Sequence, residues 1–172
     1  DGDGDIDEDD IPDIVFMSFT SSSHQSSGVL NVISGDGSGT HWAVSEPGGN
    51  VLRGSGGVAL GDLDGDGRPE ICATGSSVAV VCLDHEGSVL WAAGEETSRS
   101  GVPSIADFDA DGRAEVIFGR QIFDSEGELR GQGEHGVGGP YATSFAVDFD
   151  DDGILELVAG NAVYELDGTA MW

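Results

Sequence analysis

The sequence has no lysine and only six arginines against 33 aspartates and glutamates, which gives a formal net charge of -27. Such an excess of negative charge repels the phosphates of nucleic acids and of anionic lipid surfaces. No apolar run approaches the roughly 20 residues that a membrane-spanning helix requires. The composition therefore predicts a protein that has no nucleic-acid partner and does not insert into a membrane.

Signatures of catalysis and of nucleotide binding are also missing. Although the sequence contains 29 glycines, none lies in a Gly-x-Ser-x-Gly nucleophile motif, a phosphate-binding loop or a dinucleotide-binding fingerprint. The acidic residues could supply the carboxylate pair of a glycosidase. However, those that recur at fixed positions suit metal binding, and a coordinated carboxylate is a poor proton donor. We therefore predict that this chain is not an enzyme.

The sequence contains only two cysteines, Cys72 and Cys82. They fall in apolar segments on either side of a turn at residues 74–77, so they can face each other across two strands. A disulfide in an oxidising compartment and a pair of small buried thiols both fit this spacing. A zinc site does not, because there is no Cys-x-x-Cys pair and His85 is the one histidine nearby.

Against these absences stands one repeated motif, Asp-x-Asp-x-Asp-Gly-x-x-Glu. It occurs at residues 62–70, 107–115 and 148–156, and a variant occurs at residues 5–13. In each copy, the acids at positions 1, 3, 5 and 9 and the backbone carbonyl of position 7 can surround an ion with hard oxygen ligands, as Ca2+ requires. We therefore predict up to four Ca2+ sites. The expected ligands are Asp5, Asp7, Asp9, Ile11, Asp13, Asp62, Asp64, Asp66, Arg68, Glu70, Asp107, Asp109, Asp111, Arg113, Glu115, Asp148, Asp150, Asp152, Ile154 and Glu156.

Position 6 of the motif is a glycine in the three full copies, at Gly67, Gly112 and Gly153. The chain needs a sharp turn at this position, and glycine makes such a turn at the least steric cost. Asp10 occupies this position in the variant. The loop at residues 5–13 therefore departs furthest from the motif.

An EF-hand is the main alternative, because its Ca2+ loop begins in the same way. An EF-hand needs a bidentate glutamate at position 12 and a helix on each side. Position 12 here is Ala73, Phe118 or Ala159, and the motifs are flanked by short apolar runs that end in glycine. Such runs are typical of strands. Each loop is therefore expected to join two strands.

The motifs start at residues 5, 62, 107 and 148, so successive repeats are 57, 45 and 41 residues long. This period is typical of propeller blades. A second hairpin follows each full motif, with turns at residues 84–87, 124–127 and 167–168 that contain Asp, Glu or Gly. Each repeat is thus expected to form four antiparallel strands.

We predict an all-β fold of β-propeller blades that belongs to a larger ring of about six to eight blades. The expected blades are residues 5–46, 58–98, 103–136 and 143–172. The first blade lacks its first strand, which would leave the backbone of residues 14–18 unpaired on one side. An open edge of this kind predicts self-association through strand addition.

Tryptophans recur at equivalent positions of the repeats. Trp91 and Trp172 each stand four residues beyond a turn glycine, and Trp42 closes the corresponding segment of the first repeat. Gly131 takes this position in the third repeat. We interpret these tryptophans as packing between blades rather than as a ligand platform, because a strand needs large apolar area there to seal against its neighbour.

Residues 59–71, 106–116 and 146–157 resemble the FG-GAP or VCBS repeats of integrin-α-type propellers, and the likeness covers nearly the whole chain. The three full copies differ from the integrin pattern in having glutamate rather than aspartate at position 9. The second hairpin is similar to that of bacterial propellers that blend this repeat with a quinoprotein-like blade. The resemblance implies a propeller fold with Ca2+ sites.

Three functions remain open. The leading hypothesis is a non-catalytic, secreted or cell-surface propeller that binds Ca2+ and acts in adhesion or in recognition of a protein or glycan ligand. One alternative is the ancillary propeller of a secreted polysaccharide-degrading enzyme, and another is a calcium-stiffened module of a surface fibre. The polar insertion at residues 20–28 is either a recognition loop or a plain loop tip.

Overall fold

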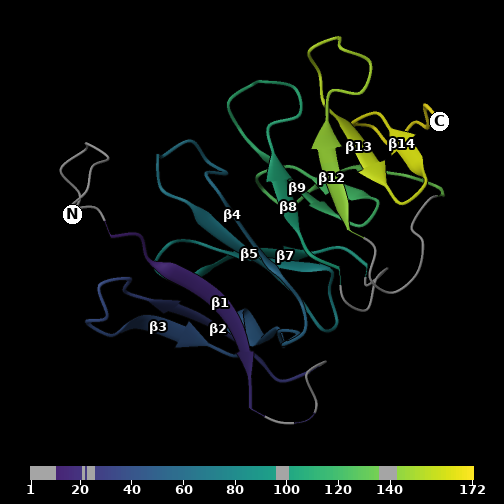
Figure 1. Cartoon of the computed structure of the whole chain (residues 1–172). Helices are drawn as coiled ribbons and strands as arrows, with labels where there is room; N and C mark the ends of the chain where they lie inside the picture. The colour runs from purple at the N-terminus through teal and green to yellow at the C-terminus, as the bar shows by residue number, and fades with distance from the viewer. Residues whose placement is uncertain (1–10, 21, 23–25, 96–100, 136–142) are drawn as a thin grey trace.

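The computed structural model describes residues 11–20, 22, 26–95, 101–135 and 143–172 (Figure 1). The predicted ligands Asp5, Asp7 and Asp9 lie outside the described residues, as does part of the insertion at residues 20–28. The described residues are all-β and form four antiparallel sheets that follow one another along the sequence. In the described part of the chain, no helix has the length and apolar character needed to cross a membrane.

The first two sheets contain three and four strands, and in each sheet the neighbouring strands are consecutive in sequence. We call them sheet 1 and sheet 2. A short 3-10 turn, η1 (Pro47–Gly49), lies in the connection between them. Sheet 1 consists of β1 (Ile14–Phe19), β2 (Gly28–Ile33) and β3 (Thr40–Val44), and sheet 2 of β4 (Val58–Gly61), β5 (Glu70–Thr74), β6 (Val80–Leu83) and β7 (Val89–Ala93).

The last two sheets, sheet 3 and sheet 4, contain four and three strands. The first strands of neighbouring sheets lie side by side, β1 with β4, β4 with β8 and β8 with β12 (Figure 1). Sheet 3 consists of β8 (Ser104–Ala106), β9 (Glu115–Phe118), β10 (Gln121–Phe123) and β11 (Leu129–Gln132), and sheet 4 of β12 (Ser144–Val147), β13 (Glu156–Ala159) and β14 (Ala162–Tyr164).

The prediction of four strands in the last repeat was wrong in detail, because sheet 4 has three. Residues 169–172 pair with β14 through an isolated bridge between Tyr164 and Ala170. The Val163 carbonyl accepts from the Met171 N–H at 2.9 Å, and the Val163 N–H donates to the Trp172 carbonyl at 3.1 Å. The pairing is therefore present, but it is too irregular around Met171 to form a continuous ladder.

The core lies between successive sheets rather than inside any one of them. Ile71 and Ala73 of β5 pack toward sheet 1, whereas Cys72 between them packs toward sheet 3. The three positions that follow the motif glutamate in each of these strands are therefore all apolar, because alternate side chains contact two different interfaces. The third cluster, which includes Phe108 and Tyr164, joins sheets 3 and 4.

Trp42 and Trp91 hold neighbouring sheets together, as the sequence predicts, whereas Trp172, for which the same packing was predicted, is 78% exposed. The Trp42 indole N–H donates to the His85 carbonyl at 3.0 Å, and the Trp91 indole N–H donates to the Ser125 carbonyl at 2.8 Å. Each bond runs from one sheet to the β-turn of the next. Gly131 occupies the matching position of sheet 3, where a Cβ atom would overlap the backbone of the following turn. The third repeat thus replaces an aromatic contact with close approach of the backbone.

Cys72 and Cys82 are directly opposite each other in the register of β5 and β6. They form a disulfide, their Cα atoms lie 4.1 Å apart, and both side chains are buried. The structure therefore decides between the two possibilities that the sequence leaves open. A cross-strand bridge of this kind is typical of proteins that fold in an oxidising compartment.

Candidate functional site: three acidic loops

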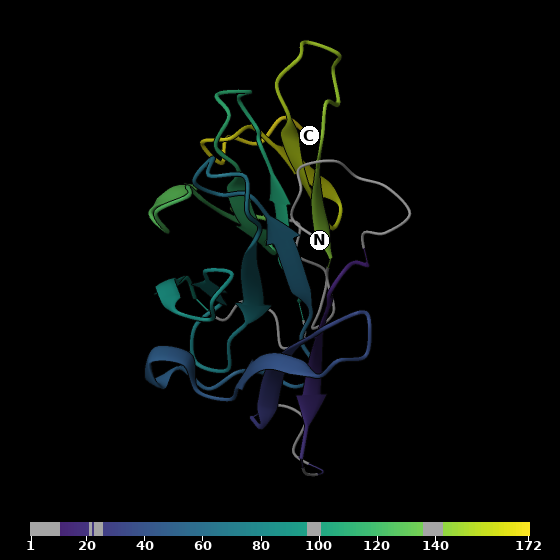
Figure 2. The same ribbon diagram turned by 90° about the vertical axis from the view of Figure 1, so that its left-hand side faces the viewer.

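The three full motifs form the loops that join β4 to β5, β8 to β9 and β12 to β13. We call them the Asp62, Asp107 and Asp148 loops. Figure 2 shows that they project from the same end of their sheets. Each loop joins two antiparallel strands, as expected, and none has the helical flanks of an EF-hand.

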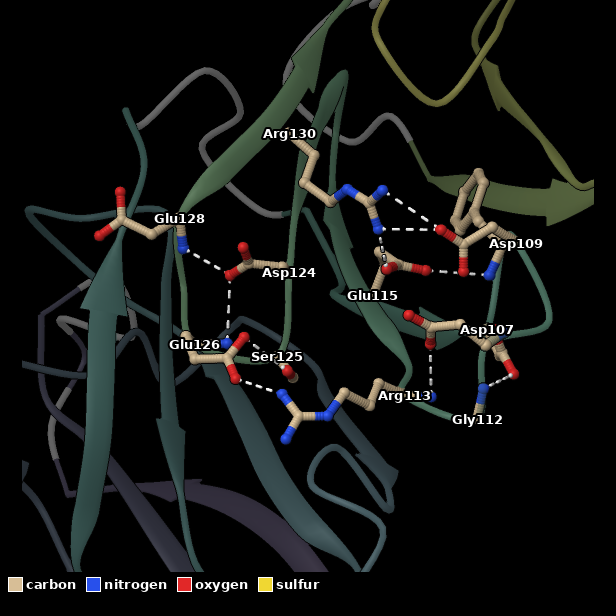
Figure 3. Close-up of polar contacts among 12 residues, drawn as sticks. Asp107, Asp109, Gly112, Arg113, Glu115, Asp124, Ser125, Glu126, Glu128 and Arg130 are labelled. Atoms are coloured by element: carbon tan, nitrogen blue, oxygen red, sulfur yellow. Dashed lines mark hydrogen bonds and ion pairs between the residues drawn. The ribbon is translucent and has the colours of Figure 1, made fainter.

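The aspartate at position 1 organises each loop through backbone N–H groups. The Asp107 carboxylate accepts from Asp111 at 3.1 Å and from Gly112 at 3.0 Å (Figure 3). The aspartate at position 5 then accepts from the N–H of position 7, as in the 2.8 Å bond from Arg113 to Asp111. The Asp62 and Asp148 loops repeat this scheme, except that Asp62 bonds positions 4 and 6. The three loops thus share one hydrogen-bonded frame.

Two positions of each loop have a positive φ. Position 6 has φ values of 84°, 88° and 92° at Gly67, Gly112 and Gly153, which confirms the expected turn. Position 4 is also left-handed, which the sequence analysis did not predict. It is a glycine in the Asp62 loop, but Ala110 and Asp151 adopt φ values of 57° and 66°. A non-glycine residue in this region costs about 1–2 kcal/mol.

The glutamate at position 9 is buried in all three loops, with 1–2% of Glu70, Glu115 and Glu156 exposed. One carboxylate oxygen of each accepts the backbone N–H of position 2, at 2.7, 2.9 and 2.7 Å. Burial raises the pKa of Glu70 and of Glu115, and the surrounding aspartates raise that of Glu70 further. The charged forms of Glu70 and Glu115 are therefore disfavoured, and a bound cation would offset this effect.

In each loop, three carboxylates offer oxygens that lie within 4.8 Å of one another. Positions 1, 3 and 5 form this group in the Asp62 and Asp148 loops. Positions 1, 3 and 9 form it in the Asp107 loop, where Glu115 takes the place of Asp111. The backbone carbonyls of Arg68, Arg113 and Ile154, at position 7 of each loop, remain predicted ligands.

The donor set fits a divalent cation. Carboxylate oxygens are hard ligands, and Ca2+ prefers them. One oxygen, Oδ1 of Asp109, is buried without a hydrogen-bond partner among the described residues. A buried carboxylate oxygen without a partner is costly unless a cation or a donor compensates it.

In the variant motif at residues 5–13, the described ligands are Ile11 and Asp13, and both are exposed. Asp13 Oδ2 lies 3.1 Å from His41 Nε2. It therefore has a different partner from the buried glutamates that occupy position 9 elsewhere.

Sequence reasoning missed Arg130. Its Nη1 lies 2.8 Å from Glu115 Oε1, and both Nη1 and Nη2 lie 3.2 Å from Asp109 Oδ2 (Figure 3). A guanidinium therefore bridges positions 3 and 9 of the Asp107 loop. Arg113, the motif's own arginine, instead pairs with Glu126 on the β10–β11 turn.

A cleft of about 550 Å³ lies between sheets 1 and 2. Its apolar wall includes Val15, Trp42 and Ile71, and its polar groups include His41 and Arg68. Arg68 Nη1 lies 2.8 Å from Nε2 of His85, which also lines the cleft. The cleft thus places one arginine, two histidines and one acid, Asp13, beside apolar surface.

Residues 1–73 match the FG-GAP-like repeat family, which confirms the resemblance seen in the sequence. The chain is also similar in structure to the V. cholerae biofilm matrix protein Bap1, with a TM-score of 0.78 and 30% sequence identity. This match covers 99% of the chain and 28% of Bap1.

A second solved structure, the exotype rhamnogalacturonan lyase YesX, matches with a TM-score of 0.55 and 17% identity. The match covers 84% of this chain and 29% of YesX, and at this identity it shows the fold alone. The chain therefore spans less than a third of either protein. No curated protein sequence matches it significantly.

Proposed function

We propose that the Asp62, Asp107 and Asp148 loops each bind one Ca2+, and that the motif at residues 5–13 binds a fourth. The observation that carries this proposal is the group of three converging carboxylates in each described loop. A bound Ca2+ supplies positive charge that offsets the repulsion among these carboxylates. The hydrogen-bonded frame of the loop holds the acids in place for it.

The four sheets are proposed to be blades of a β-propeller of about six to eight blades. Support comes from the side-by-side order of β1, β4, β8 and β12, and from the tryptophan contacts between sheets. The proposed blades are residues 5–46, 58–98, 103–136 and 143–172.

The protein is proposed to act outside the cell as a non-catalytic module of adhesion or of protein or glycan recognition. The disulfide and the likeness to a biofilm matrix protein over 99% of the chain support this role. An ancillary propeller of a polysaccharide-degrading enzyme is the second candidate. The fold of YesX favours it, although at 17% identity that likeness concerns architecture only.

The cleft between sheets 1 and 2 is the proposed recognition site. Its Arg68 guanidinium suits a ligand that carries carboxylates, and its apolar wall suits the face of a sugar ring. The experiment is calorimetric titration of oligogalacturonate, with a neutral maltooligosaccharide as the comparison.

Arg68→Gln is expected to weaken oligogalacturonate binding about tenfold, because it removes a charged donor. Arg113→Gln is the matched control, since Arg113 occupies the same motif position but pairs with Glu126. Equal binding of the neutral and acidic oligomers, or equal effects of the two substitutions, would exclude the cleft as an acidic-ligand site.

Self-association through β1 is also proposed. Among the described residues β2 is the one strand that pairs with β1, and Ile14 and Phe16 expose much of their side chains. Apolar edge strands tend to add a strand from another chain. Light scattering over a range of concentrations tests this, and a monodisperse monomer at high concentration would contradict it.

A further inference from the structure

The last hairpin of sheet 3 contains a β-bulge that directs Arg130 toward the Asp107 loop. In the register of β10 and β11, Ile122 pairs with Gly131 and Phe123 pairs with Leu129, so Arg130 is the additional residue. Bulges turn a side chain away from its regular direction and occur often beside functional sites. The position of Arg130 is therefore set by the pairing of the strands.

The Arg130 guanidinium acts as a cation inside the carboxylate group. It contacts Glu115 at 2.8 Å and Asp109 at 3.2 Å (Figure 3), and both belong to the group of acids that could hold a metal ion. Glu115 is buried, and about one third of the Arg130 side chain is exposed. Charge-assisted bonds to a buried carboxylate are among the stronger hydrogen bonds in proteins.

The same bulge recurs in the last hairpins of sheets 1 and 2 with different residues. In sheet 2, Cys82 pairs with Trp91 and Leu83 with Val89, so Leu90 is the additional residue. An aliphatic side chain can neither neutralise nor bond the acids of the Asp62 loop. The Asp62 group accordingly consists of positions 1, 3 and 5 and includes no bridged glutamate.

Sheet 1 follows the pattern of sheet 3. Val32 pairs with Trp42 and Ile33 with Thr40, so His41 is the additional residue of this bulge. Its Nε2 lies 3.1 Å from Asp13, which is position 9 of the first motif, just as Arg130 contacts position 9 of the third. The bulge residue thus contacts the last acid of its own motif in both sheets where it is basic.

We propose that the residue at this bulge determines how strongly each acidic loop depends on Ca2+. Arg130 supplies a resident positive charge to the Asp107 loop, whereas Leu90 leaves the Asp62 loop without one. Arg130 and Ca2+ compete for the same two carboxylates, Asp109 and Glu115, so the Asp107 loop binds Ca2+ more weakly and keeps its structure better after chelation. This inference rests on the proposed Ca2+ binding.

The test is amide hydrogen exchange measured by mass spectrometry on the whole chain, with Ca2+ and with EDTA. EDTA is expected to increase exchange at residues 62–67 and 148–153 more than at residues 107–112. In Arg130→Leu, which copies sheet 2, the Asp107 loop becomes as sensitive to EDTA as the Asp62 loop. Calorimetry should then show one Ca2+ bound about tenfold more tightly than in the parent chain.

Two further variants make the result specific. Leu90→Arg places the same charge at the bulge of sheet 2 and should reduce the EDTA response of residues 62–67. Arg120→Gln removes an arginine that donates to the Glu134 carbonyl, outside the carboxylate group, so it should leave residues 107–112 unchanged.

Each outcome either supports or contradicts the proposal about the bulge residue. If the Asp62 and Asp148 loops respond to Ca2+ but the Asp107 loop responds equally in the parent chain, or is unaffected by Arg130→Leu, the bulge proposal is wrong and Ca2+ binding stands. If no loop responds to Ca2+, both proposals fail. Should Arg130→Leu not fold, the comparison among loops in the parent chain and the Leu90→Arg variant still decide.

Discussion

The Asp62 and Asp107 loops have the same motif and nearly the same hydrogen-bonded frame, yet their carboxylates face different surroundings. Aspartates alone form the acidic group of the Asp62 loop, and these aspartates are exposed. In the Asp107 loop, the group includes the buried Glu115, and Arg130 from a neighbouring hairpin bridges two of its members. The motif thus determines the path of the backbone, whereas the second hairpin determines the charge of the site.

The largest expected difference between the two loops is in the stability that is lost when the buried glutamate at position 9 is removed. Glu115→Ala leaves the Phe108 N–H without its acceptor and Arg130 without its closest partner. We expect a loss of about 3 kcal/mol in the free energy of unfolding in EDTA. Glu70→Ala leaves only the Leu63 N–H unpaired and relieves repulsion from three aspartates, so about 1 kcal/mol is expected.

Urea unfolding of both variants in EDTA measures this difference. Equal losses would mean that Arg130 contributes nothing to the stability of the Asp107 loop.

The disulfide distinguishes sheets 2 and 3. Cys72 and Cys82 form a bridge between β5 and β6, whereas Ile117 and Ile122 hold the matching pair of positions in β9 and β10. Closing a loop of about 10 residues stabilises a protein by about 2–3 kcal/mol. Replacing both cysteines with alanine should therefore lower the melting temperature and increase amide exchange mainly in sheet 2. Exchange that rises equally in sheet 3 would contradict this local role.

A substitution in the metal loop can be compared with one in an ordinary turn. Asp109→Ala removes a carboxylate from the Asp107 group, so we expect the loss of one bound Ca2+ and a destabilisation of about 1 kcal/mol in Ca2+. Asp36 lies in the β2–β3 turn, where hydrogen bonds from Ser34 and Ser38 lower its pKa to about 2.

Asp36→Ala should leave the number of bound Ca2+ ions unchanged. Calorimetric titration counts the ions for both variants. If both substitutions changed the count equally, the repeated spacing would not mark the metal ligands.

The smallest effect concerns pH. Burial and the nearby aspartates raise the pKa of Glu70 above its unfolded value, so its ionisation opposes folding. This destabilisation is absent below the unfolded pKa and complete above the folded pKa. Stability in EDTA should therefore fall as pH rises from about 4.5.

Glu70→Gln keeps an oxygen for the Leu63 N–H but cannot ionise, so it should flatten this part of the pH profile. The measurement is the urea midpoint at several pH values in EDTA. An unchanged profile in Glu70→Gln would show that this carboxyl does not contribute to the pH dependence.

Much of this organisation follows from the sequence. The apolar runs beside each motif predicted the flanking strands, and Gly67, Gly112 and Gly153 predicted the left-handed turn, because these signals are local. The positive φ of Ala110 could not be predicted, because alanine does not favour that conformation. The hydrogen-bonded frame imposes it.

The roles of Arg130 and His41 also lay beyond sequence reasoning. Both depend on a one-residue shift in the pairing of a hairpin, and such a shift decides which face of the sheet a side chain meets. The number of residues between each of them and the turn glycine does not predict which way the side chain points unless the position of the bulge is known. The irregular pairing of residues 169–172 depends on register in the same way.

Ca2+ titration by calorimetry, after removal of metal by chelation, tests the central claim most directly. The parent chain should bind several Ca2+ ions, with dissociation constants on the order of 10⁻⁴ to 10⁻³ M. A variant that combines Asp62→Asn, Asp107→Asn and Asp148→Asn should lose the three ions assigned to the described loops, because each change removes charge while keeping an oxygen for the backbone bonds. No Ca2+ uptake by the parent chain, or the same uptake by the triple variant, would contradict the account.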